Sequence, residues 1–180
     1  MPTKPQILNE NTIAQSRLFC IQQVDLKFSN GETRQFERLR SSNRGAVLIV
    51  PLLDDETVLL IREYAVGVDR YELGLPKGLI EANESVIDAA NRELMEEVGY
   101  GARELTALAE LTLAPGYMSH VTTVILARHL YAEKHPGDEP EPIEVVPYAL
   151  KQISQLLKRP DFTEARSIAA LYMAKEFLQS

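Results

Sequence analysis

The segment from Gly78 to Tyr100 reads GLIEANESVIDAANRELMEEVGY and decides the fold, because it specifies one helix with an unusual end. Ser85, with Asp88 three positions later, is a capping-box pattern that predicts the start of this helix. Gly99 is a typical residue just beyond a helix end. We therefore expect one α-helix between Ser85 and Gly99. A single apolar stripe should pack it on the body of the domain: Ile87, Ala90, Leu94 and Val98.

Three glutamates, Glu93, Glu96 and Glu97, lie on the last turn and a half of this helix, at positions i, i+3 and i+4. They repel one another there and crowd the negative end of the helix dipole. At about 100° per residue, Glu93 and Glu97 lie about 40° apart, so they can hold one ion together. Hard cations such as Mg²⁺ bind carboxylate oxygens and usually bridge to substrate phosphates. The pattern favours a bound divalent metal; the alternative is a solvated acidic face with ordinary ion pairs, such as Arg92 with Glu96.

The spacing of charged residues and glycines in this segment resembles the Nudix box, the signature of hydrolases that cleave a nucleoside diphosphate linked to another moiety. Only Tyr100 departs from the family pattern, which usually has Ile, Leu or Val at this packing position. The resemblance implies an α/β class Nudix fold, an α/β/α sandwich with a mixed sheet, over residues 46–178. The box positions are filled by Gly78, Glu84, Arg92, Glu93, Glu96, Glu97 and Gly99.

Cleavage of a pyrophosphate bond requires neutralised phosphate charge, an activated water and alignment of the two. The resemblance implies that Glu93, Glu96 and Glu97 face the metal, with Glu97 the strongest candidate. It also implies that Arg92 orients these glutamates and that the carbonyl of Lys77 is a further candidate ligand. The expected cofactor is Mg²⁺, for which Mn²⁺ or another divalent ion can substitute.

The general base is expected on a different segment. In ADP-ribose pyrophosphatases of this family, a mobile acidic loop after the box supplies a glutamate, and residues 137–141, GDEPE, occupy the corresponding place. We expect Glu139 to be the base and Glu141 to be an extra metal contact; Glu96 is the alternative base, and a solvated loop is the alternative structure. Glu84 lies just before the helix N-terminus, where a carboxylate is favourable for the dipole and can also serve as a structural cap.

The residues after the box carry information on the substrate. Pro115 resembles a proline of ADP-ribose pyrophosphatases, and Tyr117 resembles a base-stacking tyrosine of diadenosine-polyphosphate hydrolases, although a Pro-Gly turn also explains the segment. Arg62 and Arg44 could each bind a phosphate oxygen or form surface salt bridges. Tyr64 and Tyr71 could each stack on adenine or simply pack.

The resemblance extends over nearly the whole chain. The segments SRLF, VDLKFSNG, IREYAVG, YELGLPKGLIEANES, GDEPEP and PDFTEAR resemble a bacterial branch of the Nudix family that acts on ADP-containing compounds. This implies hydrolysis of ADP-ribose, diadenosine di- and triphosphate and NADH, with release of AMP, and a homodimer. The alternatives are a nucleotide-sugar diphosphatase and a catalytically inactive Nudix-fold ligand sensor.

Composition limits the remaining possibilities. The chain has 180 residues, which suits one main domain, and its net charge of −7 argues against general binding to nucleic acid or an anionic membrane. Cys20 is the only cysteine, the first residues show no secretory signal, and the cytoplasm is the expected location. We divide the chain into an N-terminal β-hairpin extension, residues 1–44, which is the expected dimerisation element, and a hydrolase domain, residues 45–180.

The expected secondary structure follows from apolar patterns and turn residues. Residues 17–28 and 32–40 should form the N-terminal hairpin around Ser29-Asn30-Gly31. Strands are expected at 45–53, 57–64, 71–75, 105–113 and 121–131, with a short strand at residues 145–146. Helices are expected at 148–158 and 163–178.

Overall fold

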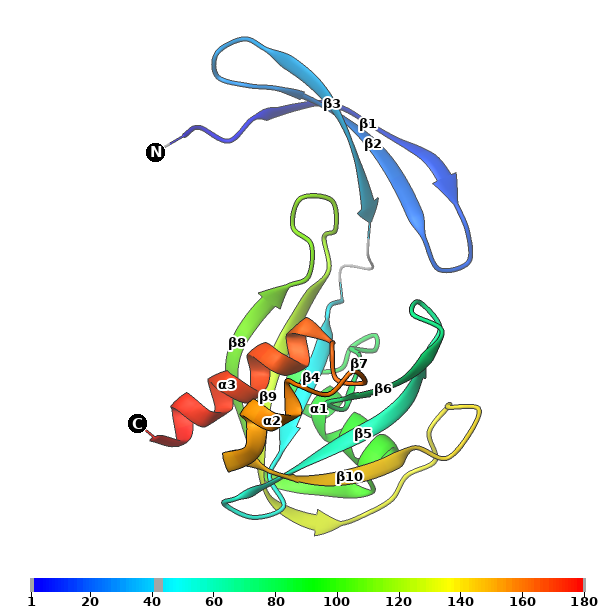
Figure 1. Ribbon diagram of the computed structural model, residues 1–180. Coiled ribbons are helices and arrows are strands. Elements are labelled where there is room, and N and C mark those ends of the chain that lie inside the picture. The colour runs from blue at the N-terminus through cyan, green and yellow to red at the C-terminus, as the bar shows by residue number, and fades with distance from the viewer. Residues whose placement is uncertain (1, 41–43, 180) are drawn as a thin grey trace. The chain divides into compact units, whose positions relative to one another are not determined.

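The computed structural model describes residues 2–40 and 44–179 (Figure 1). The chain divides into two compact units. Unit 1 comprises residues 1–45 and 112–121, and unit 2 comprises residues 46–111 and 122–180. The segment 112–121 therefore belongs with the N-terminal residues, although the chain enters and leaves it from strands of unit 2.

Unit 1 contains an antiparallel sheet of three strands in the order β1-β2-β3, formed by Gln6–Gln15, Cys20–Lys27 and Thr33–Arg40. The predicted hairpin corresponds to β2 and β3 and is confirmed. The pattern did not predict β1, because all ten of its residues are exposed and it therefore shows no apolar alternation. The loop at 112–121 joins this unit by backbone hydrogen bonds, with the Leu39 amide donating to the Tyr117 carbonyl over 2.7 Å.

Unit 2 contains two sheets, with strand orders β7-β4-β9-β8 and β10-β5-β6. The first is mixed, as expected, because β4 pairs in parallel with β9 and antiparallel with β7. The strand β7 was not predicted, since three residues are too few to show a pattern. The bounds are Ala46–Pro51 for β4, Thr57–Ala65 for β5, Arg70–Gly74 for β6, Lys77–Leu79 for β7, Tyr100–Thr112 for β8, Val121–Ala132 for β9 and Glu144–Ala149 for β10.

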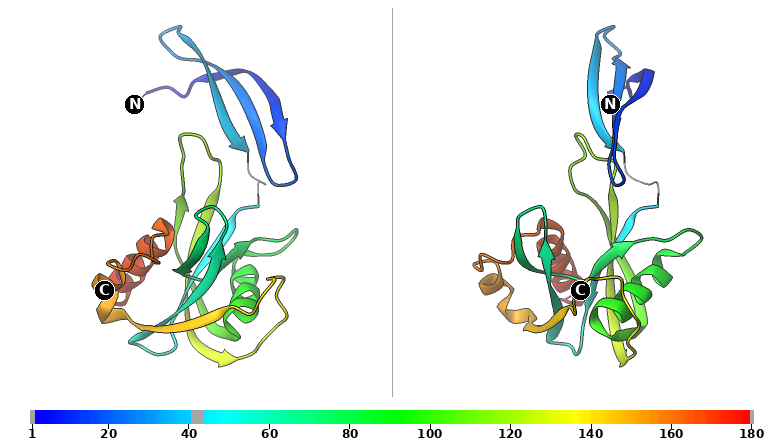
Figure 2. Two further views of the ribbon diagram at one scale, coloured as in Figure 1. Left: turned by 45° about the vertical axis from the view of Figure 1, so that its right-hand side comes forward. Right: turned by 90° about the vertical axis from the view of Figure 1, so that its right-hand side faces the viewer.

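Helices cover both faces of this unit, which confirms the α/β/α sandwich. All six residues of β4 are buried. Val47 and Ile49 pack in one core cluster with α1 (Val86–Glu93), whereas Leu48 and Val50 pack in another with α2 (Ile153–Leu156) and α3 (Ala165–Gln179). A strand buried on both faces is typical of a parallel pairing in an α/β protein. The right-hand view of Figure 2 shows α1 and the α2–α3 pair on opposite sides of the strands.

The C-terminal helices differ slightly from the expectation. A single helix was predicted over 148–158, but Tyr148 and Ala149 belong to β10, where they pair with Val58 and Thr57. The helical segment therefore starts later, with a short 3₁₀ turn, η2 (Leu150–Gln152), before α2. The last predicted helix is confirmed as α3.

Candidate active site

The helix of the box changes its winding where the glutamates lie. Ser85 caps α1 as predicted, since its Oγ accepts the Asp88 amide hydrogen at 3.1 Å. Glu93 is the last residue of α1, and the next turn, η1 (Leu94–Val98), is π-helical. Gly99 ends it with φ of 81° and donates its amide to the Leu94 carbonyl. The prediction of a regular α-helix up to Gly99 was therefore wrong in its last turn. Single π-helical turns within α-helices are frequent at functional sites.

The predicted apolar stripe is confirmed except at its first position, because Ala90, Leu94 and Val98 are buried in the core. Ile87 is exposed, whereas Ala89 and Ala90 are completely buried. Two small residues at the contact let the helix backbone approach the sheet closely, and the stripe they start continues through Glu93 and Glu97. These two carboxylates are 8% and 5% exposed, so they lie within the packed face rather than beside it.

Glu97 is held by the backbone of the strand that precedes the box. The Lys77 amide donates to Glu97 Oε2 at 2.9 Å, and Lys77 Nζ forms an ion pair with Glu63 at 2.8 Å. Burial raises the pKa of Glu97 to about 8, and the nearby positive charge of Lys77 only partly opposes this. The sequence pointed to the carbonyl of Lys77, but it gave no sign that the amide of this residue binds Glu97 or that its ammonium partly offsets the effect of burial.

Glu93 lies against Gly78. A Cβ atom at residue 78 would overlap the Glu93 carboxylate, so a glycine is required for this close approach. Burial raises the pKa of Glu93, although Arg92 Nη1 donates to its Oε1 at 2.8 Å. Gly78 was expected to permit close approach to the backbone; the group that approaches is the glutamate itself.

Arg92 joins the other charged positions of the box. Its guanidinium donates to Glu84 Oε1 at 2.8 Å, to Glu96 Oε2 at 3.0 Å and to the Leu79 carbonyl at 3.0 Å, as well as to Glu93. The expected pairing with Glu96 is present. Glu84 raises the pKa of Arg92, and Arg92 in turn lowers the pKa of Glu84. Glu84 therefore anchors the guanidinium of Arg92, in addition to accepting the Glu81 amide hydrogen.

The carboxylates fit a hard divalent cation in their chemistry, but they are not assembled around one. Within residues 2–40 and 44–179, no group of three or more His, Cys, Asp or Glu side chains is arranged to hold a metal ion. The hydrogen bonds described above engage Oε1 of Glu93 and Oε2 of Glu97, which leaves the other oxygen of each carboxylate available to a cation. The Glu93 carboxylate occupies the space that a Cβ at residue 78 would fill, so it lies directly against the backbone of Gly78.

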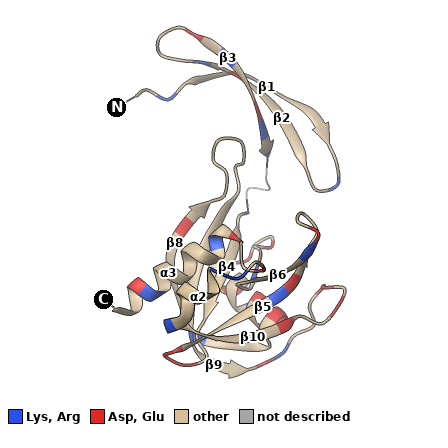
Figure 3. Ribbon diagram, viewed as in Figure 1, with Lys and Arg blue, Asp and Glu red and all other residues tan. Residues whose placement is uncertain are grey.

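The acidic loop approaches the same cluster. The negative charge of Glu139 contributes to the raised pKa of Glu93, so the two carboxylates interact across space. Glu141 is bound differently, because its Oε1 accepts a hydrogen bond from the Tyr71 hydroxyl at 2.6 Å. The loop therefore brings Glu139 toward the box and attaches Glu141 to β6. Figure 3 marks acidic positions in red and basic positions in blue.

The candidate substrate contacts of unit 2 have partners of their own. Arg62 forms ion pairs with Glu144 at 2.9 Å and with Asp161 at 2.6 Å. The ring of Tyr64 packs edge-on against Tyr71, with 5.5 Å between centroids, and its hydroxyl donates to Asp69. These contacts are sufficient to explain the positions of Arg62 and Tyr64 within unit 2.

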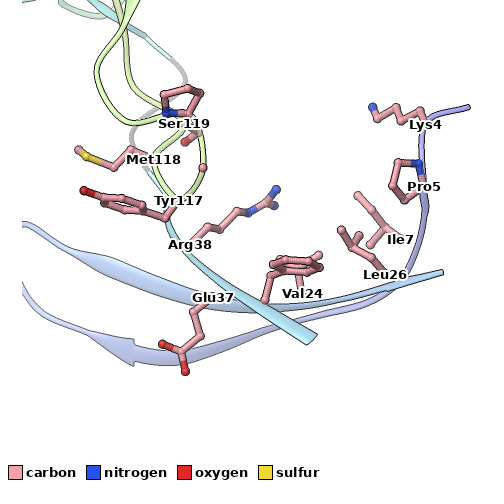
Figure 4. A pocket seen from close by; sticks show the side chains of 13 residues that line it. Lys4, Pro5, Ile7, Val24, Leu26, Glu37, Arg38, Tyr117, Met118 and Ser119 are labelled. Atoms are coloured by element: carbon pink, nitrogen blue, oxygen red, sulfur yellow. The ribbon is translucent and has the colours of Figure 1, made fainter. Parts of the chain in front are cut away.

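The remaining candidates lie in unit 1. Arg44 is exposed near its end. Pro115 and Tyr117 line a pocket of about 480 Å³ whose other wall is the N-terminal sheet. In Figure 4, Arg38 extends between the loop with Tyr117 and the strand with Val24. The wall is mostly apolar, with Ile7, Val24, Leu26 and Phe36 on the sheet side.

Comparisons with known proteins identify the family. A model of the NudE-type Nudix hydrolase N-terminal domain matches residues 5–38, and the NUDIX domain model matches residues 42–171. The chain is 53% identical to the ADP compounds hydrolase NudE of Escherichia coli K12, over 98% of this chain and 94% of that protein. It is 29% identical to an ADP-ribose pyrophosphatase of Bacillus subtilis, over 96% and 97% of the two chains.

A solved structure is similar as well. The crystal structure of an ADP compounds hydrolase matches with a TM-score of 0.93 and 52% identity, covering 99% of this chain and 96% of that chain. No helix in the part of the chain that the structure describes is long and apolar enough to cross a membrane.

Proposed function

This chain belongs to the NudE-type Nudix hydrolases, and from that premise we propose that it hydrolyses the pyrophosphate bond of ADP-containing compounds. The proposed substrates are ADP-ribose, diadenosine di- and triphosphate and NADH, each of which would release AMP. Water adds across the P–O–P anhydride, so ADP-ribose gives AMP and ribose 5-phosphate. The likeness to a named ADP compounds hydrolase over almost the entire chain supports this substrate class.

The observation that carries the proposal is the pair of buried carboxylates, Glu93 and Glu97, on the packed face of the box helix. Burial raises the pKa of both, so the fold by itself does not fully compensate their negative charge. A divalent cation would complete the compensation. A module that only binds a neutral ligand has no need to bury two neighbouring carboxylates in this way.

We propose Mg²⁺ as the cation, which when bound would supply neutralising charge at the phosphates and favour ionisation of water. Glu93 and Glu97 would hold it, and Glu96, Glu141 and the Lys77 carbonyl are further candidate ligands. Arg92 would orient Glu93 and Glu96 through the hydrogen bonds it makes to both. Glu139 would take the proton from the attacking water, with Glu96 as the alternative base.

The proposal also covers binding, assembly and location. Arg62, Arg44, Tyr64, Pro115 and Tyr117 are the candidate contacts for the phosphates and the adenine. We propose a homodimer in which residues 1–44 form the dimerisation element. We further propose a cytoplasmic location, with no nucleic-acid or membrane partner.

An assay of nucleoside monophosphate release, AMP from the adenine compounds and UMP from UDP-glucose, tests the function directly. The purified chain is incubated with ADP-ribose, diadenosine triphosphate, NADH and UDP-glucose, each with and without Mg²⁺. We expect Mg²⁺-dependent release of AMP from the first three compounds and slow turnover of UDP-glucose. Preference for UDP-glucose would instead indicate a nucleotide-sugar diphosphatase, and ligand binding without any turnover would indicate an inactive sensor.

A further inference from the structure

The segment that contains the acidic loop, residues 133–144, has backbone hydrogen bonds to the rest of unit 2 at both ends. Among the described residues, its middle has a single hydrogen bond to a distant residue. At its start, the Glu133 amide donates to the Gly99 carbonyl at 3.1 Å, and the His135 amide donates to the Met95 carbonyl at 3.2 Å. At its end, Glu144 enters β10 opposite Arg62. Between residues 136 and 143, the bond from the Tyr71 hydroxyl to Glu141 is the one hydrogen bond described to a distant part of the chain.

The sequence of the loop makes this single attachment effective. Prolines occupy positions 136, 140 and 142, so Glu139 and Glu141 each precede a proline. Proline fixes its own φ and restricts the residue before it to extended conformations, which stiffens the segment Glu139-Pro140-Glu141-Pro142. Because so few torsions are free between them, a constraint on Glu141 is transmitted to Glu139.

Tyr71 is itself well placed to act as an anchor. It is paired with Tyr64 across the β5–β6 ladder, and the two rings pack nearly perpendicular to each other, at 71°. Tyr64 is fixed in turn, because its hydroxyl donates to Asp69 in the turn between the two strands. The Tyr71 ring is therefore oriented by the sheet and not by the loop that it holds.

We infer that Tyr71 is a positioning residue that anchors the acidic loop through Glu141 and so sets where Glu139 lies relative to Glu93. The inference rests on the proposed function, because the position of Glu139 matters to turnover only if Glu139 acts in the reaction. Tyr71 touches neither Glu139 nor the box glutamates in the described contacts, so it acts through the loop.

The test replaces Tyr71 with phenylalanine, which keeps the ring contact with Tyr64 and removes the hydroxyl. We expect kcat for ADP-ribose to fall about 3- to 10-fold, the range that corresponds to one hydrogen bond, with KM nearly unchanged. Amide hydrogen exchange in residues 137–143 should become several-fold faster, while exchange elsewhere and the Tm stay as in the wild type. Tyr148→Phe is the matched control. It removes a hydroxyl that donates to the Gln152 carbonyl at 3.3 Å, and this hydrogen bond does not involve the acidic loop.

A double variant shows whether Tyr71 acts through Glu141. Tyr71→Phe added to Glu141→Ala should cause no further loss of kcat, because the bond is already absent. Unchanged exchange in the loop of Tyr71→Phe, an additive loss in the double variant, or wild-type kcat despite faster exchange would each overturn the inference. Wild-type turnover in Glu139→Gln would refute the proposed base instead, and the exchange experiment separates the two failures because it needs no substrate.

Discussion

Two groups of charged side chains in unit 2 differ in how their charges are balanced. In the Asp161 cluster (Arg62, Glu144, Arg159 and Asp161), the carboxylate of Asp161 accepts hydrogen bonds from Arg159 and Arg62. These guanidinium groups hold the pKa of Asp161 well below its usual range. In the glutamate cluster (Glu93, Glu96 and Glu97), burial instead raises the pKa of Glu93 and Glu97.

The difference separates charges that stabilise the fold from charges that the fold only tolerates. A carboxylate with a lowered pKa is more stable as an anion in the folded state than in the unfolded state. A carboxylate with a raised pKa is less stable as an anion when folded, and such groups are frequent at functional sites. The charge balance therefore indicates that Asp161 stabilises the fold, whereas Glu93 and Glu97 have a charge that a bound cation would neutralise.

The largest expected effect comes from breaking the glutamate cluster at Glu97. In Glu97→Gln, the side-chain amide oxygen can still accept the Lys77 amide hydrogen, but it provides a much weaker cation ligand. We expect kcat with ADP-ribose and Mg²⁺ to fall at least about 100-fold, with the Tm unchanged or higher because a buried anion is gone. Enzyme assays and thermal unfolding measure the two quantities.

Glu56→Gln is the control for that variant, because the side chain of Glu56 is exposed and pairs with Lys151 at the long distance of 3.8 Å. It should match the wild type in both measurements. If Glu97→Gln turned over ADP-ribose as fast as the wild type, Glu97 would not be a metal ligand, and the contrast between the two clusters would lose its functional meaning.

A smaller effect is expected from displacing Glu93 without changing it. In Gly78→Ala, the new methyl group overlaps the Glu93 carboxylate, which must move away from its place beside the backbone. We expect Mg²⁺ affinity and kcat to fall about 10- to 100-fold, the range typical of disturbed ligand positioning at a metal site. Titration calorimetry with Mg²⁺ and steady-state kinetics provide the readouts.

Gly67→Ala is the matched glycine control, since nothing lies within 4 Å of a Cβ built at that position. Its kinetics should not change. Equal kinetics for Gly78→Ala and the wild type would show that the place of Glu93 against the backbone is irrelevant to catalysis.

The sequence predicted the identity of the clustered glutamates but not their environment. The box spacing identified Glu93, Glu96, Glu97 and Arg92, and the Ser85 cap is confirmed. The burial of Glu93 and Glu97 was not predicted, because apolar periodicity treats a glutamate as a surface residue and so selected Ile87 in place of Ala89. The π-helical turn was missed for a similar reason: no residue type encodes an i to i+5 hydrogen bond.

Hydrogen bonds between residues far apart in the chain could not be predicted from the sequence either. Asp161 lies 99 positions from Arg62, and Glu141 lies 70 positions from Tyr71, so neither pair can be inferred without the fold that joins them. The order of strands and helices, by contrast, follows from local patterns, and the α/β/α arrangement was implied by the family resemblance. Where the pattern was weak, as in the exposed β1 and the short β7, strands were missed.

The Asp161 cluster is tested by Asp161→Asn. The change removes the negative charge that two arginines share, so we expect the free energy of unfolding to fall by about 1 to 3 kcal/mol. Turnover at a temperature well below the Tm should change little, since the cluster contributes to the fold. Urea unfolding and kinetics measure these effects. A loss of kcat/KM without a loss of stability would mean that Arg62 needs Asp161 in order to bind substrate.

The two clusters should also differ in their pH dependence. The pKa of Glu97 is raised from 4.5 to about 8 in the folded chain, so between these values the folded state binds more protons than the unfolded state. The contribution of Glu97 to stability therefore decreases as the pH rises through this range. Asp161 has the opposite sign, because its lowered pKa gives stability that is present above the ordinary aspartate pKa of 3.8 and is lost as the pH falls.

The same proton makes Mg²⁺ binding depend on pH. A cation that binds ionised Glu97 must displace the proton, so affinity should rise with pH up to about 8. From about pH 7 to about pH 7.5 the expected gain is at most about threefold, with fractional proton release. Calorimetry in buffers of different ionisation enthalpy measures that release. On binding Mg²⁺, Asp161→Asn should release protons as the wild type does, whereas Glu97→Gln should release fewer. Equal release from Glu97→Gln would assign the titrating proton to Glu93, whose pKa burial also raises.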